Sequence, residues 1–299
     1  MLGIVIANWN GERIIDRCLQ SLSKQKYKKF KIYIIDNGST DRSIEIIENY
    51  MNEMEMEIYK LDYNSGFAKA NNIGISNAIK DGCEYILTLN NDIEMDEYCL
   101  INAFNEIEKL KDNFQVYQLF MINYYEREIC DAIGIKFDKR LYAEQLGYKK
   151  KVIDMKKFNG EVDGACAGAA IYSSRALNSV VLQNGDYFDS NFFAYYEDVD
   201  LALRLKNRNF KTKLLKEAIV YHMHSATSSR STGFKEYYLI RNLIIYTKRN
   251  QSVKEYNRCR YSYYKTGMGM IIKNVMNPRV SYNALKGMLS GIKEANRLK

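Results

Sequence analysis

Four short polar clusters recur in the first third of the chain, and their side chains are of the types that bind metal ions and phosphates. They are Asn8-Trp9-Asn10, Asp36-Asn37, Asn64-Ser65-Gly66 and Asn90-Asn91-Asp92. Carboxylate and amide oxygens are good ligands for hard divalent cations, so a site built from them would hold phosphates through a metal ion. Each cluster taken alone is also explained as a turn, because Asn, Asp and Gly favour turns.

A group of carboxylates lies further along, in the segment FDSNFFAYYEDVDLALRL. Glu197, Asp198 and Asp200 come at the start of a helix that the leucine spacing predicts. A carboxylate in a cleft can act as a general base toward a hydroxyl. The alternative is structural, because acidic residues in the first turn of a helix are stabilised by its dipole.

The two histidines of the chain stand together in His222-Met223-His224, after the apolar run Ala218–Tyr221. Residues two apart on a strand share a face, so both imidazoles could point into one site. A functional role for at least one of them is therefore expected, and whether His224 takes part stays open.

Apolar runs at 2–7, 31–35, 57–61 and 85–89 predict strands, and apolar residues at helical spacing lie between them. This alternation predicts an α/β fold with a mainly parallel central sheet. Such sheets bind ligands at the carboxyl ends of their strands. Because each polar cluster follows one of these strands, we expect all four on one rim of the sheet.

Two local predictions accompany this reading. Ser39 or Thr40 is expected to cap the helix that follows the second strand. The small residues of the segment 161–172 (EVDGACAGAAIY) predict a close backbone approach.

The chain lacks both GxGxxG and GxxxxGK[ST], so the dinucleotide and P-loop classes are not supported. Residues 111–157 give no clear pattern.

The composition is that of a folded chain: 299 residues, 46% apolar, with one Pro. The charge is unevenly distributed, since residues 206–299 hold 20 Lys and Arg but only 4 Asp and Glu. Helical spacing continues to the end, with basic and Tyr residues interleaved after Asn242. A basic surface of this kind favours an anionic partner: an anionic membrane, nucleic acid or a phosphorylated substrate. No nucleic-acid motif accompanies it, so nucleic acid is not expected. The alternatives are solvated helices packed on the rest of the chain and a dimer interface.

The compartment is predicted to be cytoplasmic. The six cysteines are scattered without metal-ligand spacing, as expected of reduced thiols. The apolar run at the N-terminus is short for a signal peptide, and no stretch approaches 18 uninterrupted apolar residues. Peripheral contact with the inner face of the plasma membrane is the accompanying option.

Seven segments, taken together and in order, resemble the inverting glycosyltransferases of family two, in particular their rhamnosyltransferase-like branch. They are IVIANWNG, IIDNGSTDRS, NSGFAKANNIGI, LTLNNDIE, FFAYYEDVDLALRL, VYHMHSATSS and YYLIRNLIIY, and they run from residue 4 to about 246. The resemblance implies a GT-A nucleotide-diphospho-sugar transferase fold. It also implies a catalytic domain at 1–235, followed by a basic helical extension at 236–299.

The resemblance also assigns roles to residues. Asn8 and Asp36 fall where the family holds the nucleobase and ribose of the donor. Asp198 falls at the catalytic base, and its neighbour Glu197 is the candidate for orienting the acceptor. Asp92 and His222 fall at metal ligands for Mn²⁺ or Mg²⁺. Asn90 and Asn91 depart from the family's DxD motif, which leaves one carboxylate there. The full donor-binding set implied is Ala7, Asn8, Asn10, Asp36, Asn64, Gly66, Phe67, Asn90, Asn91 and Asp92.

The resemblance implies a metal-dependent, inverting hexosyltransferase of cell-surface polysaccharide assembly. Its donor would be dTDP-rhamnose or a UDP-hexose, and its acceptor a hydroxyl of a glycan or of a lipid-diphosphate-linked sugar.

Like charges raise carboxyl pKa values, so Glu197 and Asp200 are expected to raise the pKa of Asp198. A degenerate GT-A module that only binds nucleotide sugars is the alternative. A nucleotidyltransferase is disfavoured, because the first loop lacks a glycine-rich basic sequence.

Overall fold

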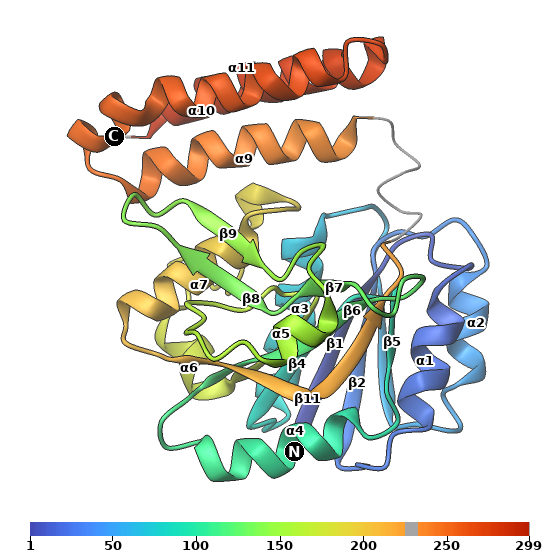
Figure 1. The fold of residues 1–299 in the computed structure, drawn as a ribbon. Helices are drawn as coiled ribbons and strands as arrows, with labels where there is room; N and C mark the ends of the chain where they lie inside the picture. Colours follow the sequence, from blue (N-terminus) through green and yellow to red (C-terminus); the bar gives the residue numbers. More distant parts are fainter. Residues whose placement is uncertain (225–232, 299) are drawn as a thin grey trace.

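The computed structural model describes residues 1–224 and 233–298, and within them a nine-stranded sheet forms the centre (Figure 1). Its order is β3-β2-β1-β4-β10-β6-β11-β5, with β7 paired to β6. The strands are β1 Leu2–Asn8, β2 Phe30–Asp36, β3 Met56–Lys60, β4 Tyr85–Leu89, β5 Ile93–Met95, β6 Val116–Asn123, β7 Cys130–Ala132, β10 Ala169–Ser173 and β11 Thr212–His222. A separate two-stranded sheet joins β8 Gly134–Phe137 to β9 Ala143–Leu146.

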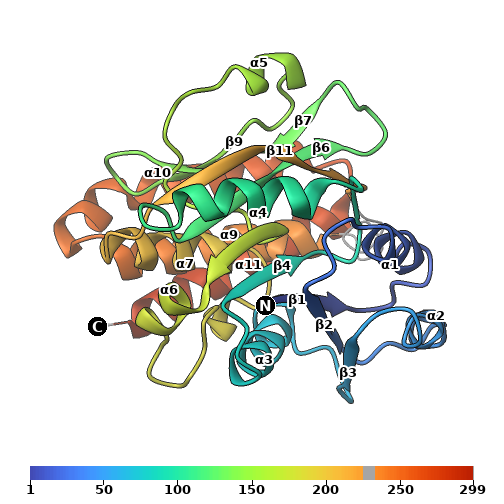
Figure 2. The same ribbon diagram turned by 90° about the horizontal axis from the view of Figure 1, so that it is seen from below.

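Helices cover both faces of the sheet. They are α1 Ile15–Ser23, α2 Ser43–Asn49, α3 Phe67–Lys80, α4 Cys99–Leu110, α5 Val152–Lys156, α6 Ser174–Ser179, the 3₁₀ turn η1 Ser190–Phe192, α7 Glu197–Asn207, α9 Phe234–Asn250, α10 Val253–Lys273 and α11 Pro278–Arg297. Seen from below, α1 and α2 lie on one side of the row β3-β2-β1-β4 and α3 on the other (Figure 2). None of these helices is both long and apolar enough to cross a membrane.

The alternation of side chains along β1 explains this double cover. Ile4 and Ile6 belong to the core shared with α1, α2 and α4, whereas Val5 belongs to the core shared with α3, α6 and α7. All three side chains are fully buried. A strand buried on both faces reads as a continuous apolar run, which is why it was predictable from sequence.

The predicted α/β fold is confirmed, with parallel pairing among the first four strands of the chain and again between β6 and β11. β1 pairs in parallel with β2 and β4, and β2 pairs in parallel with β3. Beyond β4 the sheet is mixed, because β10 is antiparallel to both β4 and β6. The register sets Asn8 beside Asp36, so two of the predicted polar clusters meet at the rim.

The predicted helix cap at Ser39 or Thr40 is wrong. α2 begins at Ser43, and Asp41 accepts hydrogen bonds from the Ser43 amide (3.0 Å) and hydroxyl (2.5 Å). Ser39 and Thr40 are engaged elsewhere, since the Asn10 amide donates to Ser39 Oγ at 2.9 Å and the Thr40 amide donates to Asn10 Oδ1 at 2.8 Å. These two residues therefore tie the loop after β2 to the loop after β1.

The three C-terminal helices form a layer beyond the carboxyl ends of the parallel strands (Figure 1). α11 packs closely on α9 through glycines: a Cβ at Gly287 would lie 2.3 Å from the Tyr237 carbonyl oxygen, and one at Gly291 would lie 2.9 Å from that of Arg241. The helix expected after Pro278 is confirmed. Residues 225–229, at the end of the matching segment VYHMHSATSS, lie outside the described residues.

Candidate active site

Asn8 organises the first part of the site. It is fully buried, its Nδ2 donates to Asp36 Oδ1 at 3.0 Å, and its Oδ1 accepts from Asn91 Nδ2 at 2.9 Å. Asp36 also accepts from the Ser39 amide at 3.0 Å. The structure thus brings three predicted donor residues into one network, although Asn8 and Asp36 face each other rather than open space. Ala7, half-buried beside them, ends the apolar run of β1.

The loop of Asn64 and Gly66 connects this rim to the carboxylates. Asn64 Oδ1 accepts from the Gly66 amide at 2.9 Å and from Asn37 Nδ2 at 3.0 Å. Gly66 has a φ of 89°, and a Cβ there would lie 2.7 Å from the Phe193 carbonyl oxygen. Only glycine fits this position, because a side chain would meet both the φ penalty and the clash. Phe67 then begins α3, so the predicted donor loop packs against the turn before α7.

The segment 166–168 lies between the two halves of the site. The backbone N–H of Asn90 donates to the Gly168 carbonyl at 2.8 Å, and the backbone N–H of Ala167 donates to Asp198 Oδ2 at 3.3 Å. Burial raises the pKa of the Cys166 thiol well above its usual value, and the nearby charges of Asp198 and Asp131 raise it further. The close approach predicted for these small residues is confirmed at Gly168, where a Cβ would lie 3.2 Å from Asn90 Nδ2.

Asp92 and His222 meet as predicted, and a third residue joins them. His222 Nε2 lies 3.3 Å from Asp92 Oδ1, while its Nδ1 lies 2.6 Å from Asp131 Oδ2. His224 Nε2 lies 2.5 Å from Asp131 Oδ1, so both histidines face one carboxylate. Asp131 was missed by sequence reasoning, since a single Asp in a segment without pattern carries no signal.

The charges of this group reinforce one another. Burial lowers the pKa of His222, but the carboxylates of Asp92 and Asp131 outweigh it and raise that pKa to about 10. For Asp131, burial raises the pKa, but hydrogen bonds from His222 and His224 outweigh it and lower the pKa to about 2.

The same group has the chemistry of a metal centre. Ligand atoms of Asp131, His222 and His224 lie within 4.8 Å of one another. Carboxylate oxygen and imidazole nitrogen are both ligands of divalent first-row metals. The residues present therefore fit a divalent cation.

Asp198 and Glu197 begin α7, as predicted. Asp198 Oδ1 accepts from the Val199 amide at 2.8 Å, and burial raises the pKa of this carboxyl. Glu197 is more deeply buried, its Oε2 has no hydrogen-bond partner among the described residues, and burial raises its pKa well above the usual value. Both carboxyls are thus poised to exchange protons nearer neutral pH than an exposed carboxyl.

Asp200 does not act as predicted. Its carboxylate is ion-paired with Arg204 at 2.8 Å and lies 3.8 Å from Arg249. These guanidinium groups offset its charge, so burial rather than Asp200 is what raises the pKa of Asp198.

The turn before α7 is held in an uncommon backbone conformation. Phe193, Tyr195 and Tyr196 have φ values of 65°, 66° and 73°. Such φ values cost free energy in residues with side chains, so surrounding contacts must enforce them. Asn242 of α9, which is fully buried, supplies these contacts: its Nδ2 lies 2.8–2.9 Å from the carbonyl oxygens of residues 192, 194 and 195.

Replacing Asn242 by Ala should therefore lower both stability and turnover. Three backbone carbonyls, one buried and two partly buried, lose a donor. We expect this to reduce the free energy of unfolding by about 1–3 kcal/mol in urea denaturation. Asn250→Ala is the matched control on α9, because its side chain donates to the Tyr246 carbonyl of its own helix, one turn back, at 2.9 Å. Unchanged stability in Asn242→Ala would show that the turn holds its own conformation.

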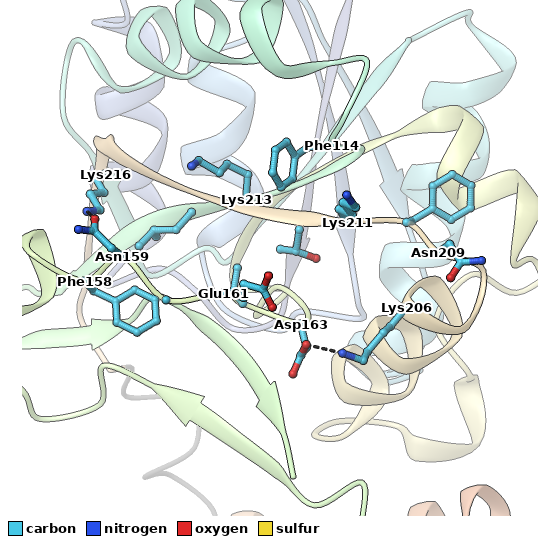
Figure 3. A pocket seen from close by; sticks show the side chains of 15 residues that line it. Phe114, Phe158, Asn159, Glu161, Asp163, Lys206, Asn209, Lys211, Lys213 and Lys216 are labelled. Carbon is cyan, nitrogen blue, oxygen red and sulfur yellow. Dashed lines mark hydrogen bonds and ion pairs between the residues drawn. The ribbon is translucent and has the colours of Figure 1, made fainter. Parts of the chain in front are cut away.

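A cavity of about 580 Å³ lies at the other end of β11 (Figure 3). Lys211 and Lys213 line it, and Lys206 pairs there with Asp163. The predicted site residues do not line it, so the rim described above is the candidate active site.

The solved structures of other proteins define the fold class. S. aureus TarS 1–349 in complex with UDP superposes with a TM-score of 0.59 at 19% identity, covering 99% of this chain and 82% of that chain. GalNAc-T7 with UDP, GalNAc and Mn²⁺ gives a TM-score of 0.59 at 13% identity, covering 93% of this chain and 58% of that one. The fold is therefore the GT-A type.

The chain belongs to glycosyltransferase family 2, whose pattern matches residues 3–181. Poly(ribitol-phosphate) beta-N-acetylglucosaminyltransferase TarS of Staphylococcus aureus is 30% identical over 103 residues, covering 33% of this chain but only 18% of TarS. Rhamnosyltransferase WbbL of Escherichia coli is 27% identical over 250 residues, covering 79% of this chain and 89% of WbbL. The family is one of transferase enzymes.

Proposed function

We propose that this protein transfers a sugar from a nucleotide-diphosphate donor to a hydroxyl group of a glycan or lipid-linked acceptor in cell-surface polysaccharide assembly. The observation that carries the proposal is the segment 166–168, which contacts Asn90 on one side and Asp198 on the other. Asn90 stands two positions before the candidate metal ligand Asp92. The donor rim with its candidate metal ligand and the candidate base therefore meet at one short stretch of backbone. A single displacement at the anomeric carbon needs both kinds of group on opposite sides of that carbon.

Asp92 and His222 are the proposed metal ligands, with Asp131 and His224 beside them. When bound, a divalent cation neutralises the negative charge that develops on the departing diphosphate. The mixture of carboxylate and imidazole favours Mn²⁺ over Mg²⁺, since Mg²⁺ prefers oxygen ligands alone. The GalNAc-T7 structure of the same fold contains Mn²⁺, which supports this choice.

Asp198 is the proposed general base. Its carboxylate takes the proton of the acceptor hydroxyl while the acceptor oxygen bonds to the anomeric carbon. The bond from that carbon to the phosphate oxygen breaks, and its electron pair leaves with the nucleoside diphosphate. One displacement inverts the anomeric configuration. Glu197 is proposed to orient the acceptor, because its buried carboxyl lies next to Asp198 in the chain.

The proposed donor is a UDP-hexose or dTDP-rhamnose, held by the ten donor-binding residues of the rim. TarS has been solved with UDP-GlcNAc, and WbbL is a rhamnosyltransferase, so relatives point to both. The alternative is a module that binds nucleotide sugars without transferring them. Asn90 and Asn91 favour it, because amides stand where two carboxylates could have added metal ligands.

We place the enzyme in the cytoplasm at the inner face of the plasma membrane. All six cysteines are unpaired in the structure, as in reducing compartments. Residues 1–235 would form the catalytic unit and 236–299 the extension that contacts the membrane. Nucleic acid is not a proposed partner.

Calorimetry with a panel of UDP- and dTDP-sugars, first with Mn²⁺ and then with EDTA, tests the proposal. We expect one nucleotide sugar to bind, with an affinity that falls by at least tenfold when the metal is removed, because the diphosphate loses its bridging cation. The tightest ligand then becomes the donor in a transfer assay. No binding of any nucleotide under either condition would contradict the proposal, and binding without transfer would favour the non-catalytic module.

A further inference from the structure

The end of α10 and the turn that leads to α11, which together form the tip of this helix pair, expose large apolar side chains. Ile272 and Val275 are each 65% exposed and Met276 is 93% exposed. Tyr282, Leu285 and Leu289 continue this surface along α11, at the spacing of one helix face. Exposing apolar side chains together in this way is unfavourable in water, so the patch indicates a binding surface.

These side chains are not needed to fold the helical layer. The face of α11 that packs on α9 is made of small residues, namely Val280, Ala284, Gly287, Gly291 and Ala295. The exposed residues Tyr282, Leu285 and Leu289 lie on a different face of the same helix. The apolar tip is therefore additional to the core rather than part of it.

The charges around the tip are of one sign. Residues 265–293 contain five basic residues and no acidic one, namely Lys265, Lys273, Arg279, Lys286 and Lys293. All five are exposed. Apolar side chains interspersed with cations match an anionic bilayer, since the apolar groups enter the acyl boundary and the cations meet the phosphates. A soluble partner protein would not require this single sign over residues 265–293.

A cavity of about 350 Å³ opens beside the tip and fits a lipid headgroup. Arg279 and Lys286 of α11 line it together with Phe234, Tyr237 and Tyr238 of α9. Tyr and Phe rings beside cations are typical of the membrane interface, where an apolar body meets a polar layer. The cavity links the tip to α9, the helix that positions the turn before Asp198 through Asn242.

We propose that the α10–α11 tip inserts into an anionic lipid bilayer, with Ile272, Val275 and Met276 in the acyl boundary and Arg279 and Lys286 on lipid phosphates. This inference rests on the proposed membrane contact and assigns it to a defined surface. Insertion at this point orients the helical layer so that the rim of the sheet faces the membrane, where a lipid-linked acceptor would be found.

Sedimentation of the full-length chain with vesicles tests the proposal. We expect binding to vesicles of equimolar phosphatidylcholine and phosphatidylglycerol, little binding to pure phosphatidylcholine, and weaker binding at high salt. The double variant Val275→Asn/Met276→Asn should lose about tenfold or more in affinity. Arg279→Gln/Lys286→Gln should lose roughly 30-fold.

Matched controls exist elsewhere on the surface. Ile153→Asn removes an apolar side chain that is 63% exposed on α5, and Lys29→Gln/Lys109→Gln removes two exposed cations. Both controls should bind vesicles like the unaltered chain. Met276→Trp provides an independent readout that keeps the tip apolar: its fluorescence should shift to the blue with anionic vesicles and be quenched by brominated acyl chains.

Donor calorimetry on the same variants separates this inference from the proposed function, since nucleotide binding should not change in any of them. Equal binding by the tip variants and the controls would overturn the inference, as would failure of the unaltered chain to bind anionic vesicles. A dimer in sedimentation velocity that the tip variants dissociate would also overturn it, because the tip would then cover a second copy of the chain.

Discussion

Replacing Asp198 by Asn should lower the turnover of sugar transfer by about 10²–10⁴-fold, the usual contribution of a general base. The change keeps the size of the side chain but removes the group that accepts the proton. Donor affinity should be unchanged, because Asp198 is not one of the predicted donor residues and Asn has nearly the same size and shape. Initial rates of transfer and calorimetry with the donor measure the two effects separately.

Glu197→Gln is the matched control for this experiment. Burial holds the pKa of Glu197 well above its usual value, which favours the neutral carboxyl that Gln resembles. The variant should retain most of the turnover, with a higher KM for the acceptor if Glu197 orients it. The reverse outcome, a loss only in Glu197→Gln, would move the base to Glu197.

The pH dependence of kcat/KM gives a second readout for the base. Asp198 must be ionised to accept a proton, so the rate should rise with pH through its pKa. Because burial raises that pKa, the midpoint should lie above that of an exposed Asp, which is about 3.9. The residual rate of Asp198→Asn should lack this rise. An identical profile in both proteins would mean that another group titrates.

Replacing Asp131 by Asn should weaken Mn²⁺ binding by about 10–100-fold, the usual cost of losing a carboxylate that orients a metal-binding histidine. Asp131 lies 2.6 Å from His222 and 2.5 Å from His224, so it fixes both rings at once. Calorimetric titration of Mn²⁺ with and without UDP measures the loss. Asp154→Asn, an exposed carboxylate on α5, controls for nonspecific metal binding.

The charge of the histidines should make Mn²⁺ binding depend on pH. A metal ion binds the unprotonated imidazole. In the metal-free protein the pKa of His222 is raised to about 10, so the cation must displace a proton at neutral pH. Affinity should therefore increase as pH rises toward that pKa, and less steeply in Asp131→Asn. Affinity independent of pH would show that His222 is not a ligand.

Proton binding to His222 and Asp131 also makes the stability of the metal-free protein depend on pH. The direction of each pKa shift determines whether stability is lost as the pH rises or as it falls. The raised pKa of His222 contributes stability that is complete below its unfolded value of 6.5 and is lost as pH rises through about 10. The lowered pKa of Asp131 contributes stability that is complete above 3.8 and is lost as pH falls through about 2. Removing the Asp131 carboxylate should flatten both limbs in urea denaturation.

The sequence by itself determined the α/β fold and the four polar clusters. These features follow from local patterns, because apolar periodicity defines strands and helices and parallel strands bring their carboxyl ends to one rim. The family resemblance selected Asp198 from the carboxylates of its segment and put Asp92 and His222 together as metal ligands. The donor-binding and catalytic roles of these residues remain predictions for the experiments above.

Only the tertiary structure decided which distant residues complete the site. Asp131 reaches His222 across 91 positions of sequence, and Asn242 reaches the turn before α7 across about 50. The helix cap predicted at Ser39 or Thr40 failed for the same reason, since both residues bond instead to Asn10. A single polar side chain has no periodicity to reveal its partner. That partner is fixed when buried donors and acceptors must all be satisfied by whatever the packed elements bring within reach.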